Sequence, residues 1–257
     1  MDQARYATSV LEKYLDNATV KASIKFYNNT LPSDMIFTKS DISTSDEQVE
    51  KLTRELNIHH RACIGSLIYL LSTRADLSFS VHKLANFSAN PVKIHFEVLV
   101  HLLRYIRDNK TLGLKYYVNI KYAPVSDLFR QASIETENHF MDFSDSSWQY
   151  CIDTDRSTGA YIIFYRVGTI YHGTHVPGPV AQSSAEREYN AEFTAGMALA
   201  HFRMLIHELL DKDTDILPEE APMILFDGKS AMFMANNGKD SKHTRHIASI
   251  MYSVSNG

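Results

Sequence analysis

The stretch H-F-M-D-F-S-D-S-S-W, residues 139–148, contains the pattern that decides the fold of the second half of this chain. Its first five residues form a short, mostly apolar run, which is typical of a buried strand. Asp145 follows this run closely. The same combination recurs at Met223–Phe226, which Asp227 follows directly. The sequence therefore predicts two buried strands that each end beside an acidic residue.

Two further strands and a long helix are predicted between these runs. The strands cover residues 159–167 and 169–175, with a tight turn at Gly168. Gly and Pro residues interrupt the chain at 173 and 177–179. A helix then begins at Ser183 or Ser184, either of which can cap it, and ends near Leu210. We expect its sheet-facing side to consist of Tyr189, Phe193, Met197, Ala200 and Met204.

The acids at these positions suit a metal-dependent nuclease. Asp145 and Asp227 follow strands, and Glu188 lies in the first turns of the long helix. Carboxylates in such positions can converge on one point, and hard oxygen ligands suit Mg²⁺. Two ions about 4 Å apart could flank a scissile phosphate. The alternative is that the acids only cap turns and a helix. Glu186 and Glu192 are rivals for the helical ligand.

The first half of the chain is predicted to be mostly helical. Helices are expected over residues 3–16, 47–56 and 59–72, and the polar region 28–46 reads as a loop. Asn90-Pro91 signals the start of another helix. Its apolar stripe contains Ile94, Val98, Leu99, Leu102, Leu103 and Ile106 before Gly113 ends it. Weak periodicity over residues 119–138 predicts the junction between two domains there.

Composition limits the function classes. Of 257 residues, 44% are apolar, enough for a sizeable core, and the net charge is −4. Residues 1–138 carry 17 Lys or Arg against 15 Asp or Glu, whereas residues 139–257 carry 9 against 15. Proteins that hold nucleic acid by bulk electrostatics usually carry a basic excess, which is absent here. An acidic nuclease centre needs metal to admit a phosphate, so the acidic second half remains compatible with catalysis.

Cysteine usage and hydropathy bear on the compartment. Cys63 and Cys151 are the two cysteines and form no CxxC pair, which favours a reducing compartment. No apolar stretch approaches ~20 residues, so no membrane span is expected. The N-terminus carries no secretory signal pattern. We therefore expect an intracellular protein of the cytoplasm, the nucleus or an organelle.

The ordered motifs of the second half resemble the ribonuclease H domain of copia-type retrotransposons. The similarity lies in F-S-D-S-S-W, D-T-D-R-S-T-G-A-Y, Q-S-S-A-E-R-E-Y-N-A, L-F-D-G-K-S-A and K-H-T-R-H-I. Upstream, I-G-S-L-I-Y-L, R-A-D-L-S-F-S-V, N-P-V-K-I-H-F, L-L-R-Y-I-R and T-L-G-L-K-Y are similar to the segment that links reverse transcriptase to that nuclease. The resemblance spans nearly the whole chain except residues 119–138.

This resemblance implies an α/β (α+β) fold. Residues 139–257 would form a ribonuclease H-like mixed sheet with flanking helices, lacking the last strand and helix. Residues 1–118 would be a helical remnant of the reverse transcriptase thumb and connection, and residues 119–138 a linker or insertion. No strand–turn with paired aspartates precedes the first helix, so polymerase activity is set aside.

The resemblance also implies site residues. Asp145, Glu188 and Asp227 match the catalytic, metal-binding acids, for Mg²⁺ or Mn²⁺. A fourth acid of the family would follow Gly257, so three carboxylates are expected to hold a single ion, with poor turnover. Lys242, His243 and Arg245 would contact the substrate backbone. The alternative for this basic cluster is a solvated helix N-terminus.

Two functions follow from these expectations. The first is metal-dependent hydrolysis of RNA in RNA–DNA hybrids, weak or lost. The second is a non-catalytic structural or interaction subunit of a larger assembly. In the family a further strand flanks the strand before Asp227. Without it, Met223–Phe226 would be an exposed edge. We expect a protein partner to cover that edge.

Overall fold

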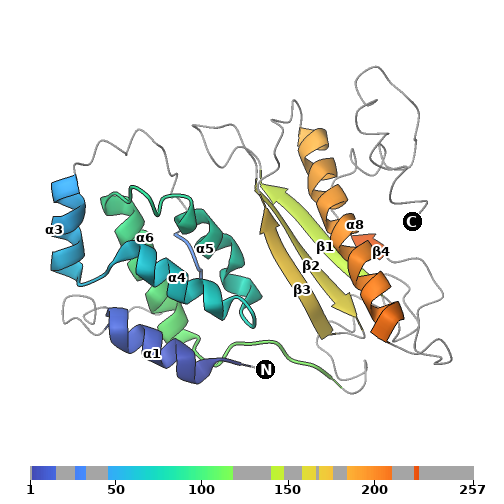
Figure 1. Cartoon of the computed structure of the whole chain (residues 1–257), viewed down its shortest axis with the longest axis horizontal. Coiled ribbons are helices and arrows are strands. Elements are labelled where there is room, and N and C mark those ends of the chain that lie inside the picture. The colour runs from blue at the N-terminus through green and yellow to red at the C-terminus, as the bar shows by residue number, and fades with distance from the viewer. Residues whose placement is uncertain are drawn as a thin grey trace. The chain divides into compact units, whose positions relative to one another are not determined.

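A computed structural model describes residues 2–15, 27–32, 46–117, 140–147, 158–165, 168–175, 184–209 and 223–225. For residues 46, 145–147, 184–189 and 223–225 it describes the backbone alone. The chain forms two compact units, of which the first ends at Leu114 and the second begins at Lys115 (Figure 1). The expected linker, residues 119–138, lies outside the described residues, so its boundaries stay a prediction.

The first unit is helical, as predicted. Its elements are α1 (Ala4–Leu15), α3 (Asp46–Leu56), α4 (His60–Leu70), the short 3₁₀ helix η2 (Ala75–Leu77), α5 (Ser78–Ala85) and α6 (Lys93–Asp108). The expected helices over residues 3–16, 47–56 and 59–72 are confirmed to within two residues at each end. Helix α5 and η2 were not predicted. They carry Ser78, Ser80 and His82 among their apolar residues, which weakens the helical pattern.

Helix α6 forms the centre of this unit. Its side chains Val98, Leu99, Leu102, Leu103 and Ile106 are buried, which confirms most of the predicted stripe. Helix α1 packs on both α4 and α6. The helix begins two residues after Pro91, because the His95 ring accepts a hydrogen bond from the backbone N–H of Val92 at 3.0 Å.

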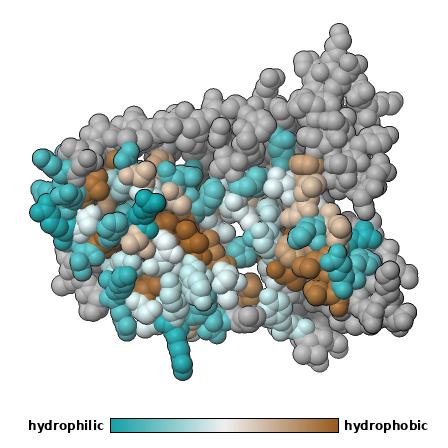
Figure 2. All heavy atoms as spheres, viewed as in Figure 1, coloured by the Kyte–Doolittle hydropathy of each residue, from teal (hydrophilic) through white to brown (hydrophobic). Residues whose placement is uncertain are grey.

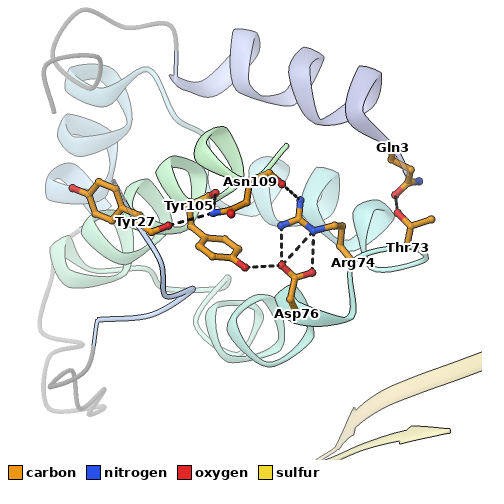
Figure 3. A network of polar contacts seen from close by, with 7 residues as sticks. All are labelled: Gln3, Tyr27, Thr73, Arg74, Asp76, Tyr105 and Asn109. Carbon is orange, nitrogen blue, oxygen red and sulfur yellow. Dashed lines mark hydrogen bonds and ion pairs between the residues drawn. The ribbon is translucent and has the colours of Figure 1, made fainter. Parts of the chain in front are cut away.

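A buried polar network joins the ends of these helices (Figure 3). The Arg74 side chain is 1% exposed and forms an ion pair with Asp76 at 2.8 Å. Its Nη1 donates to the carbonyl of Asn109, at the end of α6, at 3.0 Å. The Tyr105 hydroxyl donates to the same Asp76 carboxylate at 3.0 Å. The network therefore ties the chain after α4 to the C-terminal end of α6.

The second unit contains a four-stranded mixed sheet. Its strands are β1 (Phe140–Ser147), β2 (Thr158–Tyr165), β3 (Gly168–His175) and β4 (Met223–Leu225), in the order β3-β2-β1-β4. Strands β1, β2 and β3 form an antiparallel meander, and β4 pairs parallel to β1. With helix α8 (Ser184–Leu209) between β3 and β4, this is an α+β fold, as predicted.

Strand β1 is longer than the sequence predicted. The expected strand ended at Phe143, but backbone pairing with β2 continues through Ser147. Asp145 therefore lies inside the strand, opposite Ala160, and does not close it. The reason is that the antiparallel ladder is built from backbone N–H and C=O groups, which the polar side chains of residues 144–147 do not interrupt.

Helix α8 covers one face of the sheet. Leu199 packs with Phe140 of β1 and Ile163 of β2, and the surrounding apolar side chains are Tyr161, Tyr165, Ile170, Ala198, Phe202 and Ile206. Ala191 and Ala195 are also buried.

The predicted sheet-facing side of α8 was wrong. Met197 is 47% exposed and Met204 is 61% exposed. Small alanines let the helix approach the sheet closely, so the buried side runs through Ala191, Ala195 and Leu199 and not through the larger methionines. The side chain of Tyr189 lies outside the described residues.

Candidate functional site

Parallel pairing brings the two predicted Asp-bearing strands to one end of the sheet. Strand β4 runs in the same direction as β1, with Leu225 opposite Phe143. Asp145 lies two residues after Phe143, and Asp227 lies two residues after Leu225. Asp227 itself lies outside the described residues. The topology therefore sets the described ends of β1 and β4 side by side, and the position of Asp227 relative to Asp145 stays a prediction.

The N-terminal half of α8 lies at the same end. A Cβ placed on Gly159 would lie 3.1 Å from the Cβ of Ala191, and Gly159 pairs with Ser146 near the end of β1. Leu199 contacts Phe140 at the beginning of β1. Helix α8 therefore runs antiparallel to β1. Glu188, one helical turn before Ala191, belongs to this end as well.

The backbone thus brings together the two predicted acids that it describes, Asp145 and Glu188. Their side chains lie outside the description, so the distance between their carboxylates stays a prediction. The expected substrate-binding residues Lys242, His243 and Arg245 also lie outside the described residues. The same holds for the edge of the sheet beyond β4, where a protein partner was expected.

A buried acid that was not predicted lies between β1 and α8. Asp142 is 0% exposed, and it pairs with Ile163, which faces α8. Burial raises the pKa of this carboxyl from 3.8 to about 7. An acid inside the apolar run H-F-M-D-F is a signal that sequence reasoning could have used. Its position instead looked like part of an ordinary buried strand.

Other polar groups share the space around Asp142. Ser144, two residues along β1, and Glu192 of α8 are both buried. Glu192 therefore faces the sheet, one turn deeper than Glu188. Across the sheet, burial and then Tyr171 raise the pKa of Tyr161 to about 12, so its hydroxyl stays neutral at physiological pH. The end of the α8–sheet contact near Asp145 is polar, whereas the opposite end is apolar.

His175 completes this polar end. A Cβ on Gly159 would lie 2.6 Å from Cε1 of His175, so the imidazole occupies the space that glycine leaves open. His172 and His175 pair with Ile162 and Gly159 with no irregularity between them, so alternation puts them on opposite faces of the sheet.

Some chemistries are absent from the described side chains. No group of three His, Cys, Asp or Glu among them could hold a metal ion. The predicted trio is not part of that set. In the first unit, burial raises the pKa of the Cys63 thiol to about 12, which leaves it unreactive. No described helix is both long and apolar enough to cross a membrane.

The first unit exposes a face that sequence reasoning also missed. On α4, Ile68 is 51% exposed and Tyr69 is 62% exposed. A side chain added at Gly65, one turn earlier, would meet nothing within 4 Å. Arg61 is exposed one further turn away. These four residues occupy one side of α4, with the ring of Tyr6 packed edge-on against Tyr69 at 4.8 Å.

Comparison with known proteins finds relatives among retrotransposon polyproteins. No family model and no solved structure matches the sequence. Over 249 residues, 96% of this chain, it is 23% identical to the "Retrovirus-related Pol polyprotein from transposon TNT 1-94" of Nicotiana tabacum. Over 189 residues it is 26% identical to the corresponding polyprotein of transposon RE1 of Arabidopsis thaliana. The chain is therefore similar to retrovirus-related Pol polyproteins from transposons, which supports its origin as a fragment of a copia-type polyprotein.

The matched copia-type polyproteins are much longer than this chain. It spans 12% of the RE1 polyprotein and 16% of the TNT 1-94 polyprotein. A shorter relative is "Secreted RxLR effector protein 161" of Plasmopara viticola, 28% identical over 136 residues that cover 52% of this chain and 84% of that protein. The retroelement origin expected from the motifs is therefore confirmed, whereas the activity of this chain is a separate matter.

Proposed function

We propose that the second unit is a ribonuclease H-like nuclease that hydrolyses RNA in RNA–DNA hybrids with weak, metal-dependent turnover. The observation that carries the proposal is the parallel pairing of β1 and β4 with α8 antiparallel above them. Support for the site comes from the backbone positions of Asp145 and Glu188 towards one end of the sheet and from β4, which Asp227 follows in the sequence. The printed names of the relatives, which are retrovirus-related Pol polyproteins from transposons, support a retroelement-derived function.

The donor set fits Mg²⁺ or Mn²⁺. Three carboxylates are hard oxygen ligands, and two of them come from neighbouring parallel strands. In the proposed reaction Asp145 and Asp227 hold the ion, and Glu188 orients the attacking water from the helix. The chemistry supplied by the bound ion is activation of that water and stabilisation of the charge that develops on the phosphate. The water adds to phosphorus, the P–O bond to the neighbouring ribose breaks, and the leaving oxygen is protonated.

The proposal is tested with a labelled RNA–DNA hybrid and the full chain. We expect slow RNA cleavage with Mn²⁺, slower cleavage with Mg²⁺, and none with EDTA. Asp145→Asn should abolish cleavage without changing the circular dichroism spectrum. The matched control is Glu208→Gln, an exposed change on the far end of α8. Cleavage that survives Asp145→Asn, or that EDTA leaves unchanged, contradicts the proposal.

A second candidate function concerns the first unit, whose exposed α4 face suits nucleic-acid binding without catalysis. Tyr69 and Ile68 offer flat apolar surface, the open position at Gly65 permits close approach of a backbone, and Arg61 supplies positive charge. Aromatic side chains on which bases or sugars pack are worth about 1–3 kcal/mol each in such proteins. This function is the non-catalytic alternative to the nuclease.

Fluorescence anisotropy with labelled hybrid separates the two candidates. We expect Tyr69→Ala to weaken binding roughly tenfold and Arg61→Ala to flatten its salt dependence. Lys93→Ala, an exposed change on α6, is the control. Unchanged affinity in the Tyr69 variant rules out this face. It leaves the nuclease proposal untouched.

A further inference from the structure

The contact between α8 and the sheet has two halves of opposite character. Around Leu199 it is apolar, with Phe140 and Ile163 from the sheet. On β1, Asp142 lies opposite Ile163, at the boundary of this apolar half, and the buried Ser144 lies two residues further along the strand, towards the N-terminal half of α8. Figure 1 shows helix α8 packed lengthwise against the sheet. One half of the contact therefore gains free energy from apolar burial, and the other half costs free energy through burial of polar groups.

The buried acid at the boundary between the two halves is Asp142. Neither of its carboxylate oxygens has a hydrogen-bond partner within the part of the chain that the structure describes. The Ser144 hydroxyl is buried in the same way. The titratable group coupled to Asp142 is Tyr161 of β2. Glu192 of α8 is buried in the same helix–sheet contact, and His175 of β3 lies beside Gly159, four positions along β2 from the Ile163 that pairs with Asp142.

A fully buried, unpaired carboxylate is expensive. An ionised group taken out of water without a partner costs several kcal/mol, whereas the protonated form costs much less. Two outcomes relieve this cost. Either Asp142 takes up a proton while α8 stays docked, or the N-terminal half of α8 moves away and water reaches the carboxylate. The apolar half around Leu199 can hold the rest of the helix in place in both states.

We propose that Asp142 makes docking of the N-terminal half of α8 onto β1 conditional on proton uptake, so that this half has a docked state with neutral Asp142 and an open state with a solvated carboxylate. The device needs only a proton from solvent. It acts on the segment of α8 that carries Glu188 and on the strand that carries Asp145. Its effect on a metal site rests on the proposed nuclease function, whereas the opening itself does not.

The direction of the pH dependence follows from burial. The pKa of Asp142 is about 7 in the docked state, against an ordinary value of 3.8 when it is solvated. Because its pKa is raised in the docked state, Asp142 favours docking most strongly below pH 3.8, where it is protonated in both states. The preference is lost as the pH rises from 3.8 to about 7 and stays constant above that. Each pH unit within this window changes the docking equilibrium about tenfold. Tyr161, with a pKa of about 12, does not titrate there.

Hydrogen exchange of the full chain tests the proposal. Backbone amides of α8 between residues 184 and 199 are followed at pH 5, 6 and 7, with rates corrected for intrinsic exchange. We expect their protection to fall about ninefold from pH 5 to 6 and about fivefold from pH 6 to 7, about fiftyfold in all, while the protection of residues 202–209 falls less. Asp142→Asn should remove this dependence, because the amide is neutral at every pH. Glu208→Gln, on the exposed side of α8, should leave it unchanged.

Two results overturn the proposal. One is protection of residues 184–199 that does not change between pH 5 and 7 in the unaltered protein. The other is an equal pH dependence in the Asp142→Asn variant, which would assign the effect to Glu192 or His175. If that variant does not fold, carbon-13 NMR titration of the Asp carboxyls in the unaltered chain decides. A titration of Asp142 near 4 then contradicts the device. None of these readouts depends on nuclease activity.

Discussion

The substitution Asp76→Asn tests whether the buried network of Figure 3 holds the first unit together. Arg74 is 1% exposed, and its Nε and Nη2 both donate to the Asp76 carboxylate, at 2.9 and 2.8 Å. Removing one partner of a buried ion pair costs about 3–5 kcal/mol, because the other charge is left buried. The Asp76 side chain is 32% exposed, so water screens part of this cost. We expect a loss of about 2–3 kcal/mol.

The remaining contacts argue against full rescue by the asparagine. Its amide N–H₂ would face the guanidinium of Arg74, and the Tyr105 hydroxyl, which donates to Asp76 at 3.0 Å, would keep at most a neutral acceptor. The Arg74 hydrogen bond to the carbonyl of Asn109 remains, at 3.0 Å. The guanidinium therefore keeps one neutral acceptor in place of its counter-ion.

Hydrogen exchange of the slowest α6 amides measures this loss in the full chain. A change of 2–3 kcal/mol accelerates their exchange on the order of a hundredfold. Glu97→Gln is the matched control, since the Lys93–Glu97 pair spans 3.7 Å with both side chains at least half exposed. That variant should change the rates less than threefold. An Asp76→Asn variant that exchanges no faster than the control would refute the reasoning.

Two further predictions concern the cores of the two units. Burial, followed by the charges of His95 and His59, lowers the pKa of His60 from 6.5 to about 4. The neutral His60 ring therefore makes its whole contribution to the free energy of unfolding above pH 6.5, and this contribution falls by about 3 kcal/mol as the pH drops to about 4. In the His60→Leu variant, the free energy of unfolding measured with urea should depend less on pH below 6.5. An unchanged dependence would mean that other groups cause the loss of stability in acid. Leu199→Ala should cost about 2–5 kcal/mol and Met204→Ala less than about 0.5 kcal/mol, measured by urea unfolding. Equal costs would contradict the observed helix face.

Strong, one-sided patterns in the sequence predicted most of the fold. The stripe Val98, Leu102 and Ile106 has helical spacing and polar neighbours, so helix and face were both predictable. Glycine at 168 and the apolar runs beside it likewise indicated the β2–β3 hairpin. For both the α6 helix and the β2–β3 hairpin, any other secondary structure or orientation would bury polar side chains, so the sequence pattern allowed a single interpretation.

Helix α8 was predictable as an element but not in its orientation. It is apolar on several sides, and Figure 2 shows hydrophobic surface over the part of the molecule where it lies. Met197, Met204 and Leu209 remain exposed there, at 47%, 61% and 72%. With apolar residues on more than one side, the sequence pattern does not choose between faces. The fit of small alanines against the sheet decides it, and that fit depends on strands distant in the sequence.

For the candidate site, the sequence named acids that stay a prediction, and it did not reveal their surroundings. Asp145 and Glu188 could be named because each stands in a motif. The burial of Asp142 depends on which side of β1 faces α8, and a shift of one residue would expose it instead. That register comes from pairing with Ile163 and not from the local sequence. The site's supporting residues are therefore visible only once the strands are paired.

Asp142 and the proposed metal site make opposite demands on pH. The metal-binding acids must be ionised, whereas docking of α8 favours a neutral Asp142. The difference between about 7 and 3.8 corresponds to a docking cost of about 4 kcal/mol at neutral pH. An ion that binds the docked state alone returns about 2.7 kcal/mol at a hundred times its Kd, and about 4 kcal/mol at a thousand times. Metal thus offsets the cost only near saturation.

This conflict yields a final prediction for the nuclease. At pH 8, Asp142→Asn removes the charge without removing any proposed ligand. The Mn²⁺ concentration for half-maximal cleavage of the hybrid should then fall, by up to about a thousandfold if all of the cost is recovered. The rate at saturating Mn²⁺ should change little, because both proteins are docked there. At pH 5 the two proteins should differ less, since Asp142 is then largely neutral in the docked state. An equal Mn²⁺ requirement at pH 8 would show that α8 docking and metal binding are not coupled through this carboxyl.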